Sequence, residues 1–298
     1  MSQAPARFVH VEVFTDTPGL GNPAGVVISS APIDDEAQRR WAETVRHPGN
    51  GFLWPAGDGA YHARFHTPGR EVGLSGHTAL ACAHAALTTL EPAADHVVLR
   101  SRTTDLPVAR RSGALWLTLA TPRLEPLAAP LPAISAALGL PPDAGFRAEI
   151  PVMRTSDGDL LLPLAEDVDP VALVPDFDAL AAIGTGLGTR GFFVYSLSAH
   201  AADADIQSRF FAPHIGLPED VATGSVHAPL AAYLWRLGRT RGSGPTVEVV
   251  GEQGAALGRP CRVRVELAFE GGSLARASVG GAVVTLDESP AELARAPG

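Results

Sequence analysis

The segment RFHTPGREVGLSGHTALACAHAAL, residues 64–87, decides the fold, because a second segment of the chain has the same layout. Its counterpart is RFFAPHIGLPEDVATGSVHAPLAAYL, residues 209–234. Each reads as a strand, an Arg-Phe-x-x-Pro turn, a loop, a glycine followed by a polar residue, and an apolar helix. This self-similarity at about half the chain length predicts two related domains.

The length and composition are consistent with two domains and exclude several classes of function. The chain has 298 residues, of which 46% are hydrophobic, enough for one large core or two smaller ones. The net charge of -9, without a basic run, argues against nucleic acid or an anionic membrane as the partner. No apolar run is long enough to span a bilayer. The absence of lysine excludes a pyridoxal-phosphate Schiff base and a P-loop ATPase.

The two cysteines, Cys82 and Cys261, lie far apart in the sequence and outside any metal-ligand spacing. We therefore expect no disulfide scaffold, no metal site and a reducing, cytoplasmic setting. Along the rest of the chain, the patterns predict a strand over Phe8–Phe14 and a helix over Asp34–Val45. The segment Pro122–Pro142 is rich in proline and alanine and is expected to cross between domains.

The repeated unit has the features of an anion-binding site. Gly76 and Gly224 each precede a polar residue at the predicted start of a helix, where unpaired N–H groups and the positive dipole end point outward. Two such starts facing each other would hold one small carboxylate without lysine or metal. The alternative is helix capping alone, for which Ser75 and Thr223 are suitable residues.

Three segments carry a resemblance to a known family. They are Gly21-Asn22-Pro23, Ser75-Gly76-His77 after Phe65-x-Thr67-Pro68, and above all Glu219-Asp220-Val221-Ala222-Thr223-Gly224-Ser225. The chain resembles the PhzF-like phenazine-biosynthesis proteins, which have the diaminopimelate epimerase-like fold. The resemblance implies an α+β fold of two pseudo-symmetric domains, each a curved, mainly antiparallel sheet wrapped round a central helix. It also implies an active site between the domains, a homodimer, and no metal or organic cofactor.

With this fold, the first domain is expected to span residues 1–123, completed by a C-terminal strand within 279–298. The second domain is expected to span residues 124–278.

The resemblance also implies site residues. His77, Asp220 and Ser225 match the histidine, aspartate and serine that assist proton transfer in the PhzF branch. Racemase relatives use two cysteines, whose places are taken here by Ser75 and by Ala222 or Thr223. Alanine carries no proton and a lone serine is a poor base, so a two-thiol racemase is not expected.

One position departs from the family. The S-E-S/T-x-F segment that holds the family's catalytic glutamate aligns on residues 47–52, and Gly49 takes the glutamate's place. His77 with Asp220 is the first candidate for the proton carrier, His47 the second and Glu43 the third. The glycine also predicts extra space for the substrate.

The sequence therefore predicts a cofactor-independent isomerase that moves a proton or double bond in a small unsaturated carboxylic or cyclic amino acid. The catalytic residues would be His77, Asp220 and His47. The substrate-binding residues would be Gly76, Gly224, Ser225, Asn22, Gly49 and Thr223. The setting implied is specialised metabolism, such as antibiotic biosynthesis. Two alternatives stay open: a lyase that uses the same enolate-like intermediate, and a non-catalytic protein that binds a small acid.

Overall fold

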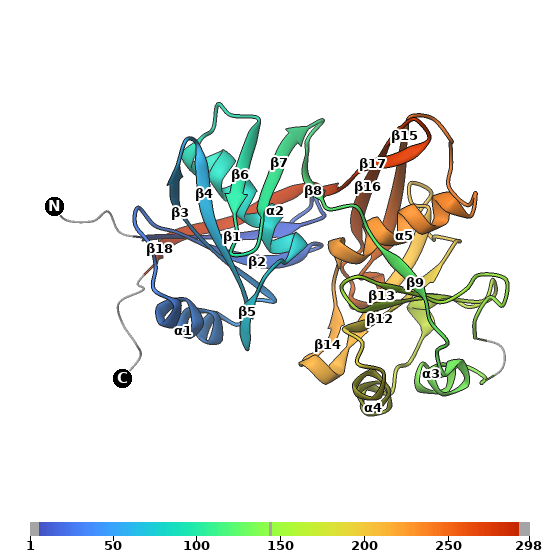
Figure 1. Cartoon of the computed structure of the whole chain (residues 1–298). Coiled ribbons are helices and arrows are strands. Elements are labelled where there is room, and N and C mark those ends of the chain that lie inside the picture. The colour runs from blue at the N-terminus through green and yellow to red at the C-terminus, as the bar shows by residue number, and fades with distance from the viewer. Residues whose placement is uncertain (1–5, 143–144, 292–298) are drawn as a thin grey trace. The chain divides into compact units, whose positions relative to one another are not determined.

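The computed structural model describes residues 6–142 and 145–291. The chain divides into two compact units: unit 1 is Met1–Leu119 with Val279–Gly298, and unit 2 is Ala120–Ser278. Each unit is described by itself (Figure 1).

Unit 1 is a sheet with one helix packed on each face. Its elements are β1 (Ala6–Val13), β2 (Asn22–Ile28), α1 (Asp35–Val45), β3 (Gly49–Gly57), β4 (Ala60–Thr67), β5 (Arg70–Val72), α2 (Gly76–Ala85), the π-helical turn Ala86–Leu90, β6 (His96–Arg100), β7 (Asp105–Arg111), β8 (Ala114–Leu119) and, from the end of the chain, β18 (Val283–Ala291).

Unit 2 is also a sheet with helices on both faces. Its elements are β9 (Leu124–Pro126), α3 (Leu131–Ala137), β10 (Met153–Thr155), β11 (Asp159–Pro163), α4 (Phe177–Leu187), β12 (Gly191–Ser196), β13 (Ile206–Ala212), β14 (Leu217–Asp220), α5 (Gly224–Arg236), β15 (Thr246–Gln253), β16 (Cys261–Glu270) and β17 (Ser273–Gly281), with 3₁₀ turns at Pro170–Ala172, Pro213–Ile215 and Ala255–Leu257.

The two units repeat one order of strand pairing. In unit 1, β1–β2 is antiparallel, β2–β3 parallel, β3–β4 and β4–β5 antiparallel, β4–β6 parallel and β6–β7 antiparallel. In unit 2, β10–β11, β11–β12, β12–β13, β13–β14, β13–β15 and β15–β16 follow the same sequence of directions. The internal repeat predicted from residues 64–87 and 209–234 is therefore confirmed.

The helix after the repeated loop is central in each unit. Nine of the ten residues of α2 and ten of the thirteen of α5 are buried, so neither helix has a polar face. Figure 1 shows the strands of each unit curving round these helices. The α+β class, with a mainly antiparallel curved sheet round a central helix, is confirmed.

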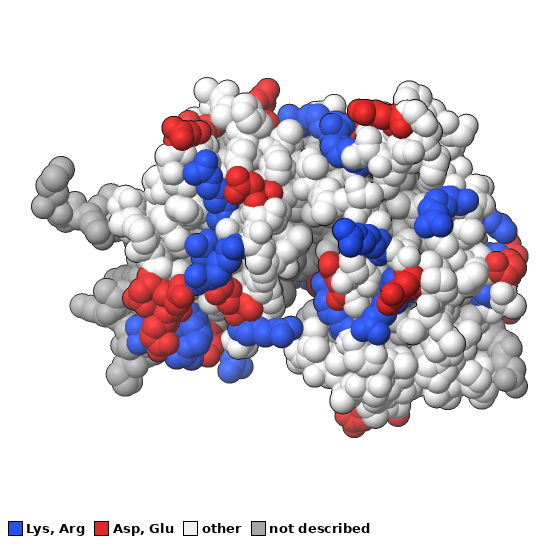
Figure 2. All heavy atoms as spheres, viewed as in Figure 1, with Lys and Arg blue, Asp and Glu red and all other residues white. Residues whose placement is uncertain are grey.

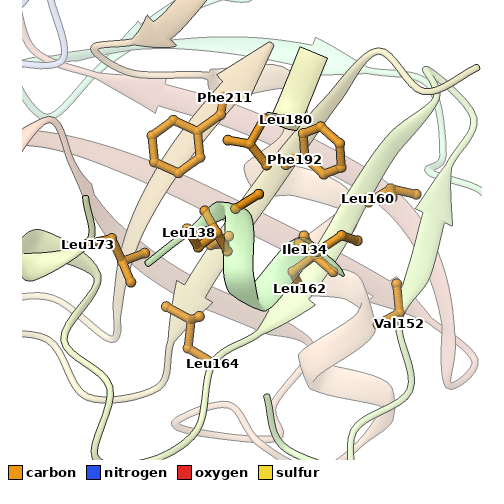
Figure 3. Packing of buried hydrophobic residues seen from close by; sticks show 12 residues of the cluster. Ile134, Leu138, Val152, Leu160, Leu162, Leu164, Leu173, Leu180, Phe192 and Phe211 are labelled. Atoms are coloured by element: carbon orange, nitrogen blue, oxygen red, sulfur yellow. The ribbon is translucent and has the colours of Figure 1, made fainter. Parts of the chain in front are cut away.

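Unit 2 has a second apolar layer on the other face of its sheet. Inward-facing residues of β11 and β12 pack there against α3 and α4 (Figure 3). The members shown as sticks include Ile134, Leu138, Leu160, Leu162, Leu180 and Phe192. The period-2 alternation of the strands places these side chains opposite those that face α5.

The segment Pro122–Pro142 differs from the prediction of a plain crossover, because it contains β9 and α3. Pro132 stands in the first turn of α3, where a missing N–H costs nothing. The proline content therefore marks a helix start as well as a connection.

Helix α1 begins where the acidic residues predicted it. The side chain of Asp34 accepts hydrogen bonds from the backbone N–H groups of Glu36, at 2.9 Å, and Ala37, at 3.0 Å. Its outer face carries ion pairs of Arg39 with Glu36 and Glu43. Figure 2 shows acidic and basic side chains mixed over this helix rather than gathered into a patch of one sign.

Candidate functional site

The start of α2 in unit 1 forms the first half-site, defined here as Gly49, Ser75, Gly76, His77 and Thr78. Ser75 is the N-cap residue, but its side chain makes no capping hydrogen bond to the backbone. Its hydroxyl instead lies 2.8 Å from Thr78 Oγ1 and 3.4 Å from His77 Nδ1. The side chains at this helix start therefore bond to one another, which is not what capping alone predicts.

Gly49 and His77 are packed so closely that only glycine fits at residue 49. A Cβ atom there would overlap Thr78 Oγ1 and His77 Nε2 and would lie 3.1 Å from His77 Cδ2. The imidazole thus occupies the space that a side chain at residue 49 would take. The extra substrate space predicted from this glycine is filled in the structure by His77.

Cys82 lies one turn further along α2, under Gly51, where the Cβ of any other residue would overlap its Sγ. Burial raises the pKa of the Cys82 thiol, so the thiolate is suppressed. This environment gives Cys82 the character of a packing residue. It agrees with the expectation that the chain does not use a pair of thiols.

The start of α5 in unit 2 forms the second half-site, defined here as Asp220, Thr223, Gly224 and Ser225. Asp220 ends β14 and is 8% exposed, and its Oδ2 accepts a 2.7 Å hydrogen bond from Thr223 Oγ1. Thr223, like Ser75, makes no side-chain cap. Ser225 is half-buried, while Gly224 and Val226 on either side of it are buried.

Gln253 braces this second half-site, and sequence reasoning missed it. Its fully buried amide donates to the backbone oxygen of Asp220 at 2.9 Å and accepts from the backbone N–H of Thr223 at 3.0 Å. Gly254 follows with φ +89, and a Cβ there would lie 2.7 Å from the backbone oxygen of Val221. The end of β15 therefore fixes both ends of the loop from Asp220 to Thr223.

Arg190, just before β12, is a second residue that sequence reasoning missed. Its Nε donates to Asp159 Oδ1 at 2.7 Å, its Nη2 donates to Asp159 Oδ2, and the same Nη2 donates to Ser225 Oγ at 3.1 Å. Asp159 is 1% exposed, whereas the Arg190 side chain is 31% exposed. A partly accessible cation therefore lies beside Ser225. No motif signalled it, because Arg190 is 35 residues from Ser225.

Glu219, the other acidic residue of the signature, has a structural role. It forms a bidentate pair with Arg209, with both hydrogen bonds 2.8 Å long and both side chains 7% exposed. Arg209 also donates to the backbone oxygens of Pro170 and Leu173. The arginine of the repeated Arg-Phe-x-x-Pro turn thus holds β14 in place through Glu219.

His227 lies on the buried side of α5. Its Nδ1 donates to the backbone oxygen of Thr223 at 2.9 Å, and its ring packs edge-on against Phe193. Burial lowers the pKa of His227 to about 4, although the hydrogen bond to Thr223 acts in the other direction. This histidine is therefore neutral near pH 7 and acts as a packing residue.

His47 is placed apart from His77. Its ring stacks on Phe8 and lies 4.4 Å, centroid to centroid, from His10, on the sheet face that α1 covers. A Cβ atom at residue 49 would instead face α2, on the opposite side of the sheet. The sheet of unit 1 thus separates His47 from the first half-site. Burial and His10 lower the pKa of His47, and Asp287 opposes them.

The remaining candidates, Asn22 and Glu43, also belong to unit 1. Asn22 is fully buried and begins β2, opposite Val13. The loop before it is held by Glu12, whose carboxylate accepts from the N–H groups of Gly19 at 2.6 Å and Gly21 at 3.3 Å. Glu43 is exposed on α1 and pairs with Arg39 at 2.7 Å.

Among the residues that the structure describes, no group of three or more His, Cys, Asp and Glu side chains is arranged to hold a metal ion. Across residues 6–142 and 145–291, none of the helices has the length and apolar character needed to cross a membrane.

The sequence of the chain matches that of a known protein family. Residues 11–289 match the family model of the phenazine biosynthesis-like proteins, PhzC-PhzF. An uncharacterized isomerase of Pseudomonas aeruginosa is 36% identical over 259 residues, which cover 86% of this chain and 90% of that protein. Relatives of this kind, together with the family match, show that the chain is an isomerase-type enzyme.

Solved structures agree on the fold. The PhzF-family phenazine biosynthesis protein of Bacillus anthracis superposes with a TM-score of 0.84 at 20% identity, over 98% of this chain and all of that chain. A hydroxyproline epimerase of Agrobacterium vitis superposes with a TM-score of 0.57 at 13% identity, over 95% of this chain and 91% of that one. The resemblance found in the sequence is confirmed: the chain belongs to the phenazine biosynthesis-like (PhzC-PhzF) family.

Proposed function

We propose that this protein is a cofactor-independent isomerase that moves a proton, and with it a double bond, in a small unsaturated carboxylic or cyclic amino acid. His77 and Asp220 are the acid/base groups of this reaction. One of them removes an allylic proton and the other returns a proton elsewhere on the carbon skeleton. A positioned acid/base group contributes about 10²–10⁴-fold to such a step.

The observation that carries the proposal is the packing of His77 against Gly49. The imidazole stands where any side chain at residue 49 would stand, at the start of a buried helix. We propose that His77 thereby takes over the task of the glutamate that the family has at this position. An imidazole suits that task because its ordinary pKa lies near neutral pH.

The helix starts supply the other part of the proposed chemistry. The first N–H groups of an α-helix have no partner within the helix, so they bind a carboxylate or stabilise the charge of a dienolate. Gly76 and Gly224 let a substrate approach the backbone closely, and Thr223 and Ser225 add hydroxyl groups. Asn22 and Gly49 complete the proposed set of binding residues. His47 has no part in this proposal, because it packs on the other face of its sheet.

The test is incubation in D₂O with a panel of β,γ-unsaturated acids, such as but-3-enoate and cyclohexa-2,5-diene-1-carboxylate. The proposal predicts deuterium in the recovered acid, seen by proton NMR, and a product of the same molecular formula apart from deuterium, seen by mass spectrometry. A fragment or dehydrated product would show a lyase instead. Saturable binding without exchange would show a non-catalytic acid-binding protein.

The cellular setting is part of the proposal. We propose a role in specialised metabolism, which the family name supports. We further propose that the protein is a cytoplasmic homodimer. Size-exclusion chromatography with light scattering tests the dimer directly.

A further inference from the structure

The second half-site contains an arginine that serves two partners at once. Arg190 directs the Nε and Nη2 edge of its guanidinium at the buried carboxylate of Asp159. Asp159 is fixed in turn, because it begins β11 and its backbone N–H donates to Thr155 Oγ1 at 3.0 Å. The carboxylate that binds this edge of the guanidinium is therefore held by the start of β11.

The second partner is Ser225, in the first turn of α5. Nη2 of Arg190 donates to Ser225 Oγ at 3.1 Å. A guanidinium has only donors, so the serine oxygen must be the acceptor in this bond. The hydroxyl proton of Ser225 then points to some other acceptor. Arg190 thus fixes Ser225 as a hydrogen-bond donor toward whatever lies beyond it.

Arg190 remains charged in this environment. Burial lowers its pKa, but the hydrogen bonds and charge of Asp159, with smaller contributions from Asp157 and Asp220, raise it overall. The side chain is also 31% exposed, and its plane lies over the ring of Phe210, with Cζ 5.7 Å from the centroid. If Arg190 served only to neutralise Asp159, its contact with Ser225 would have no effect on ligand binding. If Arg190 also positions Ser225, its removal should change which ligands bind.

Resting on the proposed function, we propose that Arg190 is a positioning residue that makes the start of α5 select a carboxylate over its neutral analogue. It does so by holding Ser225 as a hydrogen-bond donor to the substrate carboxylate. A carboxylate can accept this bond with either oxygen and gains from its charge, whereas an amide of the same shape has one oxygen acceptor and no charge.

The test uses benzoate and benzamide, a planar unsaturated acid and its neutral isostere, titrated into the full-length protein by isothermal titration calorimetry. Wild type is expected to bind benzoate more tightly than benzamide. Ser225→Ala is expected to weaken benzoate binding by about tenfold and benzamide binding by about threefold or less, since hydrogen bonds to charged groups are the stronger ones.

The decisive variant is the combined change Asp159→Asn with Arg190→Met. It removes one positive and one negative charge, so the net charge and the long-range field stay nearly unchanged. When this double change is made in the protein that keeps Ser225, benzoate affinity should fall by about tenfold. When it is made in Ser225→Ala, benzoate affinity should hardly fall further. The matched control is Glu248→Gln with Arg264→Met, which removes an exposed Arg–Glu pair of unit 2 and should leave both affinities unchanged.

Loss of a buried ion pair can prevent folding, so Arg190→Lys provides the same test in a protein that keeps the charge. A lysine that pairs with Asp159 no longer offers the fork that also reaches Ser225, and the preference for benzoate should shrink. Preserved preference in a folded variant, an equal loss in the Ser225→Ala background, or a wild type that binds neither probe would overturn the inference. The D₂O exchange assay decides the proposed reaction separately, since binding of benzoate requires no proton transfer.

Discussion

Replacing Gly49 with alanine is the perturbation that examines the first half-site most closely. The added Cβ would overlap His77 Nε2 and Thr78 Oγ1, both of which belong to buried residues. Overpacking of this kind costs about 1–3 kcal/mol. The lower conformational entropy of the unfolded alanine chain returns about 0.4–1 kcal/mol. We therefore expect Gly49→Ala to lower the free energy of unfolding by up to about 2.6 kcal/mol.

The matched control is Gly69→Ala. A Cβ at residue 69 meets nothing within 4 Å, and this glycine has no positive φ. This control should stabilise the protein slightly, because it has the entropic gain without the overlap. Chemical unfolding of both variants measures the difference, and D₂O exchange measures the effect on chemistry, which should fall only in Gly49→Ala.

A double-mutant cycle with His77→Ala isolates the contact. Removal of the imidazole opens the space that the alanine needs, so the two changes should destabilise the protein by less than the sum of their single effects. Additive effects, or a Gly49→Ala protein that behaves like Gly69→Ala in stability and exchange, would refute the placement of His77 against Gly49.

Further predictions concern the same framework. Gly49→Glu should destabilise unit 1 without raising activity, since its Cβ meets the same overlap, and gain of exchange on unsaturated acids would contradict this. Gln253→Leu should lower stability by about 1–3 kcal/mol in chemical unfolding and slow exchange, because it removes three hydrogen bonds from the Asp220–Thr223 loop. Glu219→Gln should cost about 3–5 kcal/mol in the same assay, because Arg209 is left buried without its carboxylate; an unchanged stability would show that the pair is dispensable. Stability should also fall as the pH drops from about 6.5 toward 4, since the unfolded chain takes up protons there that the folded His227 and His84, each with a pKa of about 4, do not. His227→Gln should reduce that slope in urea titrations at several pH values, and an unchanged slope would show that His227 does not contribute to it.

The features of the fold that the sequence predicted depend on local pattern. The apolar runs of residues 79–87 and 226–234 become the buried helices α2 and α5, and the acidic residues near Asp34 become the start of α1. The composition of residues 122–142 predicts a crossover between domains and does not reveal helix α3. Two prolines at a helix start are equally compatible with helix initiation, and the packing of Ile134 and Leu138 into the core decides the outcome.

The sequence could predict only those parts of the candidate site that lie within the repeated motif. The glycines at 76 and 224 and the residues beside them stand in the repeat itself. Gln253 and Arg190 act on the second half-site from strands that are distant in sequence, so their contacts arise only in the tertiary structure. The close approach of His77 to Gly49 is equally invisible in the sequence, because it depends on how α2 packs against β3.

The central claim is that His77 and Asp220 carry the protons, and the rate of deuterium incorporation in D₂O tests it most directly. On the unsaturated acid that wild type exchanges, His77→Ala and Asp220→Asn should each lower the rate by about 10²–10⁴-fold. The exposed counterparts His96→Ala and Asp178→Asn should leave it unchanged. Exchange at the wild-type rate in both site variants would contradict the account.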